Sequence, residues 1–267
     1  MKTYVIETEN LVREYKGQRV VDRLNMHVPE GRIYALLGRN GAGKTTTMKM
    51  LLNLVRPSGG TFFLFGRQNA GPDKQNYRRI GSVIETPAFY KNLTARENLE
   101  ILARLRGRHR KDTIERALCA VNLEKESRKL FREYSLGMKQ RLGLAAAIMH
   151  EPELLILDEP MNGLDPVGIQ MTRRYLQQLC REKGTTILIS SHVLNEIEQL
   201  ADMVGVIHKG RLLEETSLQE LYRRSRRYAQ FRLSDVEKAS LLLERRFHIS
   251  DYAATGGNTL RLYEHID

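Results

Sequence analysis

Nine consecutive residues have the types and the spacing that bind phosphate groups: Gly38, Arg39, Asn40, Gly41, Ala42, Gly43, Lys44, Thr45 and Thr46. Glycines in such a stretch allow backbone N–H groups to close around phosphate oxygens, and the positive end of a following helix dipole adds to the attraction. We expect the Lys44 ammonium to reach the β- and γ-phosphates of a nucleoside triphosphate, and the Thr45 hydroxyl to ligate Mg²⁺. The stretch therefore predicts a nucleotide-binding loop.

Two carboxylates, Asp158 and Glu159, follow the fully apolar run Leu154–Leu157. In open α/β sheets, ligands bind beyond the carboxyl ends of the strands. We expect Asp158 to hold Mg²⁺, a hard cation that prefers oxygen ligands, and Glu159 to polarise the attacking water. An exposed acidic pair without a function is the alternative for these two residues alone, and the phosphate loop upstream favours the catalytic interpretation.

The elements on either side of the loop disfavour a chance pattern in a glycine-rich turn. The apolar run Ile33–Leu37 predicts a buried strand before the loop, and apolar residues recur at helical spacing after it, namely Met48, Leu51, Leu52 and Val55. Other strand-like runs cover residues 3–8, 18–28, 61–65, 80–84, 154–157, 185–189, 203–208 and 211–214. Tyr15 is expected on a polar loop between the first two. Because strands alternate with helical runs, the chain predicts an α/β fold with a mixed sheet flanked by helices and an antiparallel β part.

Two segments depart from this alternation. From about residue 87 to residue 149 the pattern is almost entirely helical and includes a capping box of Thr94 and Glu97, which predicts a helical insertion. After residue 224 a short pattern of alternating and helical runs predicts a small appended extension, β-rich and of α+β type. We therefore expect two domains, 1–224 and 225–267.

The composition restricts the class of protein. The chain has 267 residues, a formal net charge of +11 and two cysteines, Cys119 and Cys180. Two cysteines provide no framework of disulfides and predict reduced thiols in the cytosol. No apolar run approaches the roughly 20 residues of a membrane-spanning helix, and the N-terminus lacks the pattern of a signal peptide. The positive charge leaves three interpretations open: a solvated face, attraction to anionic lipid or a membrane partner, and nucleic-acid binding.

Further motifs carry a resemblance to a known family. Residues 134–141 resemble the signature motif of ATP-binding cassette (ABC) ATPases, and residues 162–165 resemble the D-loop of that family. His192 is similar in position to the family's switch histidine, and Tyr15 to the aromatic residue that stacks on adenine, with Val20 packing nearby. These motifs follow the family's order over residues 3 to about 220. The resemblance implies a P-loop ABC ATPase core.

The resemblance also implies a head-to-tail homodimer in which two ATP molecules lie between the chains. Each ATP would be held by the phosphate loop of one chain and by the signature helix and D-loop of the other, through Ser135, Leu136, Gly137, Met138 and Asp165. Ser135 suits the cap of a helix whose N–H groups face the γ-phosphate. Leu136 departs from the glycine that the family usually has there, and its side chain is expected to crowd the site.

A second departure is Glu85, which stands where the family usually has a glutamine that senses Mg²⁺ and the membrane subunit. A carboxylate at this place is expected to ligate Mg²⁺, and it adds negative charge near the γ-phosphate. Glutamate here, together with the signature sequence, resembles the ABC ATPases of bacitracin and lantibiotic self-protection and resistance. Another drug, lipid or ion exporter ATPase is the first alternative, and a soluble ABC protein acting on nucleic acid or ribosomes is the second.

The sequence therefore predicts an ATP-hydrolysing subunit of an ABC transporter. By the resemblance, Lys44, Glu159 and His192 are the catalytic residues, with His192 contacting the γ-phosphate, and Thr45, Asp158 and Glu85 are the Mg²⁺ ligands. ATP and Mg²⁺ are the expected cofactors. The expected partners are a second copy of the chain and a separately encoded membrane permease, with no nucleic acid. The expected place is the cytoplasmic, inner face of the cell membrane, as a peripheral subunit.

Overall fold

The computed structural model describes residues 3–69, 71–85, 87–107, 111–225, 228–255 and 258–263. The chain divides into two compact units, Met1–Leu218 and Gln219–Asp267. The first unit contains a six-stranded and a five-stranded sheet, and the second has a three-stranded sheet of its own. The structural division precedes the boundary expected after residue 224, because helix α8 (Leu218–Ser225) belongs almost wholly to the second unit.

The central sheet of the first unit has the strand order β11-β10-β4-β9-β8-β7. Its strands are β4 (Ile33–Leu37), β7 (Ile80–Val83), β8 (Leu154–Leu157), β9 (Thr186–Ser191), β10 (Met203–His208) and β11 (Arg211–Ser217). Only β11 runs antiparallel to its neighbour, and the other pairs are parallel. All residues of β8 and β9 are buried, as expected for parallel strands covered on both faces. The carboxyl ends of β4, β8 and β9 therefore meet at one edge.

The second sheet of this unit is antiparallel and is built on the long strand β1. It comprises β1 (Tyr4–Tyr15), β2 (Gln18–Leu24), β3 (His27–Pro29), β5 (Gly59–Leu64) and β6 (Arg67–Gln68). Its buried side chains pack with those of the central sheet and helix α1 (Lys44–Leu51) in one hydrophobic core. Tyr15 is the last residue of β1, so the expectation that it lies on a loop was wrong.

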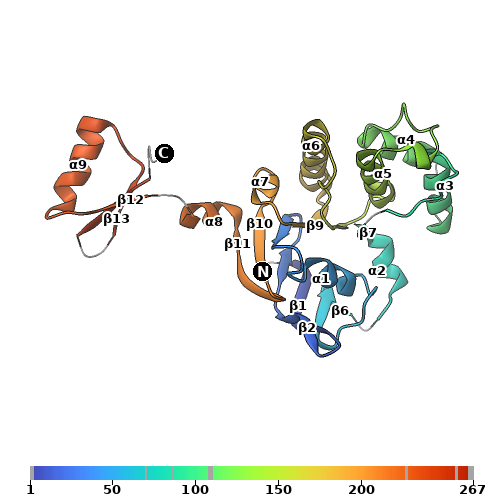
Figure 1. Ribbon diagram of the computed structural model, residues 1–267, viewed down its shortest axis with the longest axis horizontal. Coiled ribbons are helices and arrows are strands. Elements are labelled where there is room, and N and C mark those ends of the chain that lie inside the picture. The colour runs from blue at the N-terminus through green and yellow to red at the C-terminus, as the bar shows by residue number, and fades with distance from the viewer. Residues whose placement is uncertain are drawn as a thin grey trace. The chain divides into compact units, whose positions relative to one another are not determined.

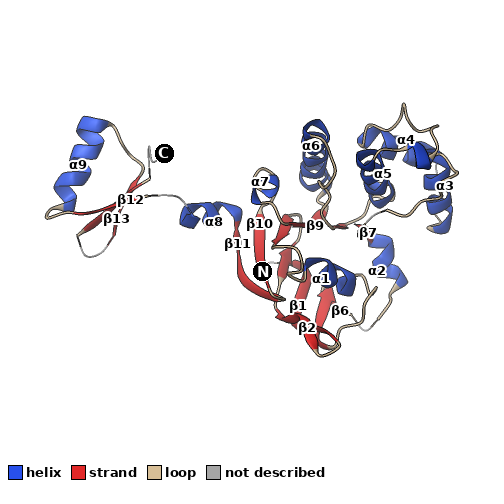
Figure 2. Cartoon of the chain, in the orientation of Figure 1, coloured by secondary structure: helices blue, strands red, loops and turns tan. Residues whose placement is uncertain are grey.

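Helices connect and cover the strands (Figures 1 and 2). They are α1 (Lys44–Leu51), α2 (Lys74–Arg79), α3 (Ala95–Leu105), α4 (Lys111–Ala120), the 3₁₀ turn η1 (Phe131–Glu133), α5 (Leu136–Ile148), α6 (Pro166–Lys183) and α7 (Leu194–Ile197). Helices α3, α4 and α5 gather beside one another between β7 and β8 in the chain. The capping box forms, because the Thr94 hydroxyl accepts from Glu97 N and the Glu97 carboxylate accepts from Thr94 N.

In its described residues, the second unit has one helix and one antiparallel sheet besides α8. Its elements are β12 (Ala229–Arg232), α9 (Val236–Phe247), β13 (Tyr252–Thr255) and β14 (Thr259–Leu262), in the order β12-β14-β13. Strand β13 was not expected from the sequence. Among the described residues, no helix is both long enough and apolar enough to cross a bilayer.

Candidate functional site

The phosphate loop connects β4 to α1 at the carboxyl edge of the central sheet. Arg39, Asn40 and Gly41 are exposed, whereas Ala42 and Gly43 are buried. Gly43 has φ +109°, and a Cβ there would lie 2.7 Å from the carbonyl oxygen of Val20, so this position requires glycine. The first N–H groups of α1 find no acceptor within the helix itself. The loop therefore presents backbone donors and a helix start at its exposed rim, which is the requirement for phosphate binding.

Lys44, the first residue of α1, has a side chain that is only 6% exposed. Its Nζ donates to the carbonyl oxygen of Gly38 at 2.6 Å and lies 3.2 Å from Oε1 of Glu159. The ammonium is thus folded back across its own loop. Its charge is available at the place where the loop amides converge.

Asp158 follows β8 and is buried, with both carboxylate oxygens in short hydrogen bonds. Thr45 Oγ1 donates to Oδ2 at 2.7 Å, and Ser190 Oγ donates to Oδ1 at 2.6 Å. A hydroxyl and a carboxylate in contact form the oxygen donor set that Mg²⁺ prefers, so Thr45 and Asp158 fit this ion.

Ser190 is a residue of the site that the sequence did not predict. Its Oγ donates to Asp158 and accepts from the backbone N–H of Glu159 at 2.8 Å, so one hydroxyl orients both acids. The signal was present in the strand register. Because Leu157 of β8 lies opposite Ile189 of β9, the next residues along these parallel strands are neighbours.

Glu159 joins the lysine to the histidine that follows β9. Its Oε2 lies 2.9 Å from Nδ1 of His192, while its Oε1 faces Lys44. The backbone of Glu159 has φ +48°, an uncommon conformation for a residue other than glycine. Strained residues of this kind gather at functional sites, where the surrounding structure holds them. The structure therefore brings together Lys44, Thr45, Asp158, Glu159 and His192.

The predicted signature residues and the D-loop make side-chain contacts of their own. Ser135 caps α5 by accepting from Met138 N at 3.2 Å, and Asp165 caps α6 by accepting from Gly168 N at 3.2 Å. Within the described part of the chain, no hydrogen bond or ion pair joins Ser135 or Asp165 to the five residues of the nucleotide cluster. The side chains of Ser135 and Asp165 thus form a set of their own. The D-loop adjoins the nucleotide cluster through its backbone, because Asn162 N donates to the carbonyl oxygen of Glu159 at 3.0 Å.

Leu136 packs on the D-loop. Its side chain is 60% exposed, and its Cδ2 is 2.7 Å from the position that a Cβ on Gly163 would occupy. Gly163 also has φ +76°, so a side chain there would strain the backbone and would require Leu136 to move. Gly137 lies close to the same loop, because a Cβ on it would be 3.2 Å from the carbonyl oxygen of Gly163. Part of the leucine side chain is therefore engaged by its own chain.

The remaining predicted residues lie at the margins of the nucleotide cluster. Tyr15 is 40% exposed, and the Arg13 guanidinium lies 4.2 Å from its ring centroid. Glu85 has φ +60° and a largely exposed carboxylate, whose Oε1 is 2.5 Å from Nζ of Lys49. Lys49 lies one turn beyond Thr45 on α1. The contact that the structure gives Glu85 is therefore an ion pair beside the predicted Mg²⁺ ligands.

Comparison with known proteins decides the family. The family model described as "ABC transporter" matches residues 21–162. The chain belongs to the ABC transporter family. It is therefore an ATP-binding protein and an ATPase, and the resemblance drawn from the motifs is confirmed.

Two relatives within the ABC transporter family are similar to this chain over most of its length. The chain is 57% identical over 261 residues to the bacitracin transport ATP-binding protein BcrA of Enterococcus faecalis, covering 98% of this chain and 84% of that protein. It is 42% identical over 211 residues to the lantibiotic transport ATP-binding protein SrtF of Streptococcus pyogenes, covering 79% and 90%. Both relatives are named as transport ATP-binding proteins.

A solved ATP-binding subunit of an ABC transporter is similar in fold. It superposes with a TM-score of 0.74 at 32% identity, over 82% of this chain and 92% of that one. The predicted fold class, a P-loop ABC ATPase core with mixed and antiparallel sheets, is confirmed.

Proposed function

We propose that this ABC ATPase powers the export or clearance of a peptide antibiotic of the bacitracin or lantibiotic kind, through a separately encoded membrane permease. The names of the relatives BcrA and SrtF support the substrate class. One observation carries the chemistry: at the phosphate loop Lys44 and His192 both pair with Glu159, Thr45 donates to Asp158, and the Ser190 hydroxyl joins Asp158 to Glu159.

Binding of the nucleotide falls to the loop and to the residues around it. The amides of the exposed rim and the Lys44 ammonium would hold the β- and γ-phosphates, and Thr45 and Asp158 would hold Mg²⁺. Mg²⁺, when bound, neutralises charge between the two phosphates. Tyr15 would stack on adenine, and its exposed ring supports this role.

Hydrolysis requires a water aimed at the γ-phosphorus and a group that takes its proton. Glu159 would orient this water and accept the proton, because it stands at the strand end beside Lys44 with its backbone fixed by Ser190. His192 would hold the Glu159 carboxylate through its Nδ1 and contact the γ-phosphate through the rest of the ring. The reaction is phosphoryl transfer to water, so positioning and charge stabilisation supply most of the catalysis.

A head-to-tail homodimer is the assembly that we propose, and the position of Ser135 supports it. The capped start of α5 has N–H groups that suit a phosphate, but its cap Ser135 makes no contact with the nucleotide cluster of its own chain within the described residues. In a second copy turned end to end, Ser135, Leu136, Gly137 and Met138 would face the ATP held by the first, with Asp165 beside them. ATP would then close the dimer, and hydrolysis would release it.

Work would pass to the permease at the inner face of the membrane, through residues 85–94 and the helices that follow. Within the described part of this segment, Tyr90 is 65% exposed although its backbone N–H is fixed by Asn98. An exposed aromatic residue on an anchored backbone suits a docking contact. Glu85 stands at the start of the segment and is tied to α1 through Lys49.

Replacement of Glu85 should uncouple transport from hydrolysis. We expect Glu85→Ala to lower antibiotic resistance of cells by about tenfold while the ATPase activity of the isolated chain stays within about twofold, because the exposed ion pair with Lys49 contributes little to stability. Growth at graded bacitracin concentrations and phosphate release measure the two effects. Glu153→Ala, which breaks a similarly exposed pair with Arg79, is the matched control. Equal losses of resistance and ATPase activity would mean that Glu85 is only a ligand of the catalytic site.

The function itself is tested by reconstitution. The multi-span protein that co-purifies with the chain from membranes is identified, and both are placed in liposomes. We expect bacitracin or a lantibiotic to raise ATP hydrolysis several-fold over the basal rate, whereas an unrelated cationic peptide of the same length does not, because only a transported substrate shifts the coupled equilibrium. Stimulation by a lipid, an ion or another drug instead would assign the chain to a different exporter. Stimulation by RNA without any membrane protein would contradict the proposal altogether.

A further inference from the structure

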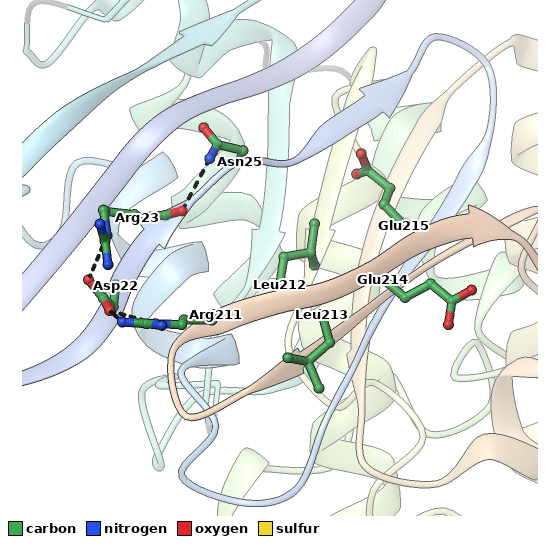
Figure 3. Close-up of a pocket in the computed structure, with 8 residues that line it drawn as sticks. All are labelled: Asp22, Arg23, Asn25, Arg211, Leu212, Leu213, Glu214 and Glu215. Carbon is green, nitrogen blue, oxygen red and sulfur yellow. Dashed lines mark hydrogen bonds and ion pairs between the residues drawn. The ribbon is translucent and has the colours of Figure 1, made fainter.

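An ion pair joins two strands that lie far apart in the sequence. Arg211 opens β11, and Asp22 lies in β2, 189 positions earlier. Arg211 Nε donates to Asp22 Oδ2 at 2.6 Å, and a terminal guanidinium nitrogen lies 2.5 Å from the same oxygen (Figure 3). The Asp22 side chain is only 8% exposed. Charge-assisted hydrogen bonds this short at a nearly buried carboxylate are among the stronger polar contacts in proteins.

Among the described residues, three arginines approach Asp22, and one of them, Arg211, lies on a different strand. Arg19 and Arg23 also approach its Oδ1, at 3.0 and 3.5 Å, but both lie on β2 with Asp22 itself. The hydrogen bond from Arg211 lowers the pKa of Asp22, against the opposing effect of burial and with help from Arg19. The carboxylate is therefore ionised at neutral pH. Of the three arginines, Arg211 is the one that joins β11 to β2, beside the backbone hydrogen bond that Asp22 N donates to the carbonyl oxygen of Gly210.

Gly210, the residue before Arg211, lies between this ion pair and the phosphate loop. Its carbonyl oxygen accepts from Asp22 N at 2.9 Å, and its N–H donates to the carbonyl oxygen of Ala42 at 2.9 Å. A Cβ on Gly210 would lie 2.5 Å from the carbonyl oxygen of Val20, so the turn packs directly on β2. A chain of contacts thus runs from Asp22 through Gly210 to Ala42.

The turn at Gly210 is also close to Gly43, the residue that follows Ala42 in the phosphate loop. A Cβ on Gly43 would be 2.7 Å from the carbonyl oxygen of Val20 and 3.5 Å from the Cα of Gly210. The backbones of β2, the turn and the phosphate loop are consequently in close contact. If the turn shifted away from β2, the carbonyl oxygen of Ala42 would lose the hydrogen bond that Gly210 N–H donates to it. The backbone amides that follow Ala42 would then change orientation.

We propose that Arg211 and Asp22 are positioning residues of the nucleotide site: their ion pair holds Gly210 against Ala42 and so fixes the phosphate-loop amides in the orientation that binds ATP. The proposal rests on the nucleotide-binding role given to the loop above. Within the described part of the chain, the ion pairs of the two side chains are with one another and with Arg19 and Arg23, so they are not given a direct role in binding the nucleotide. Their effect is on affinity for ATP, since the catalytic acids are held independently by Ser190.

Arg211→Ala in the full chain tests this. We expect the Kd for ATP to rise about fivefold, as the loss of one charge-assisted contact at a nearly buried partner implies, while kcat at saturating ATP stays within about twofold. Displacement of a fluorescent ATP analogue measures Kd, and phosphate release measures kcat. Arg211→Lys, which keeps a cation within reach of Asp22, should recover most of the affinity.

Arg23→Ala is the matched control, because it removes the same charge from the same carboxylate but breaks no link between strands. We expect its Kd for ATP to stay within about twofold of the wild type. Equal losses in Arg23→Ala and Arg211→Ala would overturn the proposal in favour of a general charge effect. An unchanged Kd in a folded Arg211→Ala variant would also overturn it, as would a loss confined to kcat.

Two further comparisons, one with conservative variants and one with a double mutant, test the proposal if Arg211→Ala does not fold. If Arg211→Ala does not fold, Arg211→Gln and Arg211→Lys are compared in its place, and the proposal fails unless Gln weakens ATP binding more than Lys does. In a double-mutant cycle with Asp22→Asn, the two substitutions should be non-additive, because either one alone breaks the pair. The Kd of the wild-type protein for ATP is measured before any variant is compared. A wild-type protein that binds no ATP would refute the proposed function itself.

Discussion

Glu159→Gln is expected to bind ATP with at least native affinity while ATP turnover falls by about a thousandfold, within the range that loss of a general base costs. The amide keeps the shape of the side chain and a polar contact to His192, but it cannot accept the proton of the attacking water. Its neutrality also leaves the Lys44 ammonium, 3.2 Å away, without its carboxylate partner and free to attract phosphate. Phosphate release and equilibrium nucleotide binding measure the two effects.

The same variant should reveal the dimer. Because hydrolysis is expected to release the two chains, a protein that binds ATP without hydrolysing it should accumulate as a dimer, detected by light scattering after size exclusion with ATP and Mg²⁺. Glu153→Gln is the control, since Glu153 precedes the same strand β8 at its opposite end and pairs with Arg79. Near-normal turnover in Glu159→Gln would refute the role of Glu159, and a monomer that holds ATP would refute the proposed closure.

Lys44→Met is expected to weaken ATP binding by about a hundredfold. Hydrogen bonds to charged groups contribute roughly 1.5–3 kcal/mol each, and 1.4 kcal/mol is tenfold in Kd, so the loss of an ammonium that bonds two phosphates reaches this size. The methionine fills a similar volume at a buried position, so the thermal midpoint without nucleotide should change little. Isothermal titration with ATP measures the effect.

Lys49→Met provides the comparison for Lys44→Met. The two lysines lie on the same helix, but the Lys49 side chain is 28% exposed and pairs with Glu85. We expect ATP affinity of Lys49→Met to stay within about threefold, since its charge is one turn further from the loop and partly screened by water. If both variants lose affinity equally, the phosphate contact belongs to the general positive field of α1 and not to Lys44.

The nucleotide cluster could be predicted where its residues are close in sequence. The loop from Gly38 to Thr46 and the pair Asp158 and Glu159 are local patterns, each bounded by an apolar strand. The helix caps at Ser135 and Asp165 are equally local, because a cap depends on residues within three positions of it. Features that depend on residues close together in the sequence can be predicted without a structure.

Residues whose roles depend on strand pairing could not be predicted. Ser190 is a site residue only because β8 and β9 are neighbours in the sheet, and Arg211 meets Asp22 only because β11 and β2 approach one another. The contact of Leu136 with Gly163 was likewise not expected, and the prediction that this leucine crowds the ATP site stays a prediction. Each of these contacts joins separate elements, so no local pattern of residue types specifies it.

The packing of Leu136 on Gly163 limits how these two positions can change during evolution. A Cβ at position 163 would meet the leucine, which would have to move aside, so a substitution there is tolerated more readily once position 136 has become small. A substitution at 163 made while Leu136 is present meets the leucine, whereas a change of leucine to glycine at 136 removes that contact beforehand. In a homologue with glycine at position 136, position 163 is therefore expected to accept a side chain more readily. Asparagine is the example, because it tolerates the left-handed backbone region.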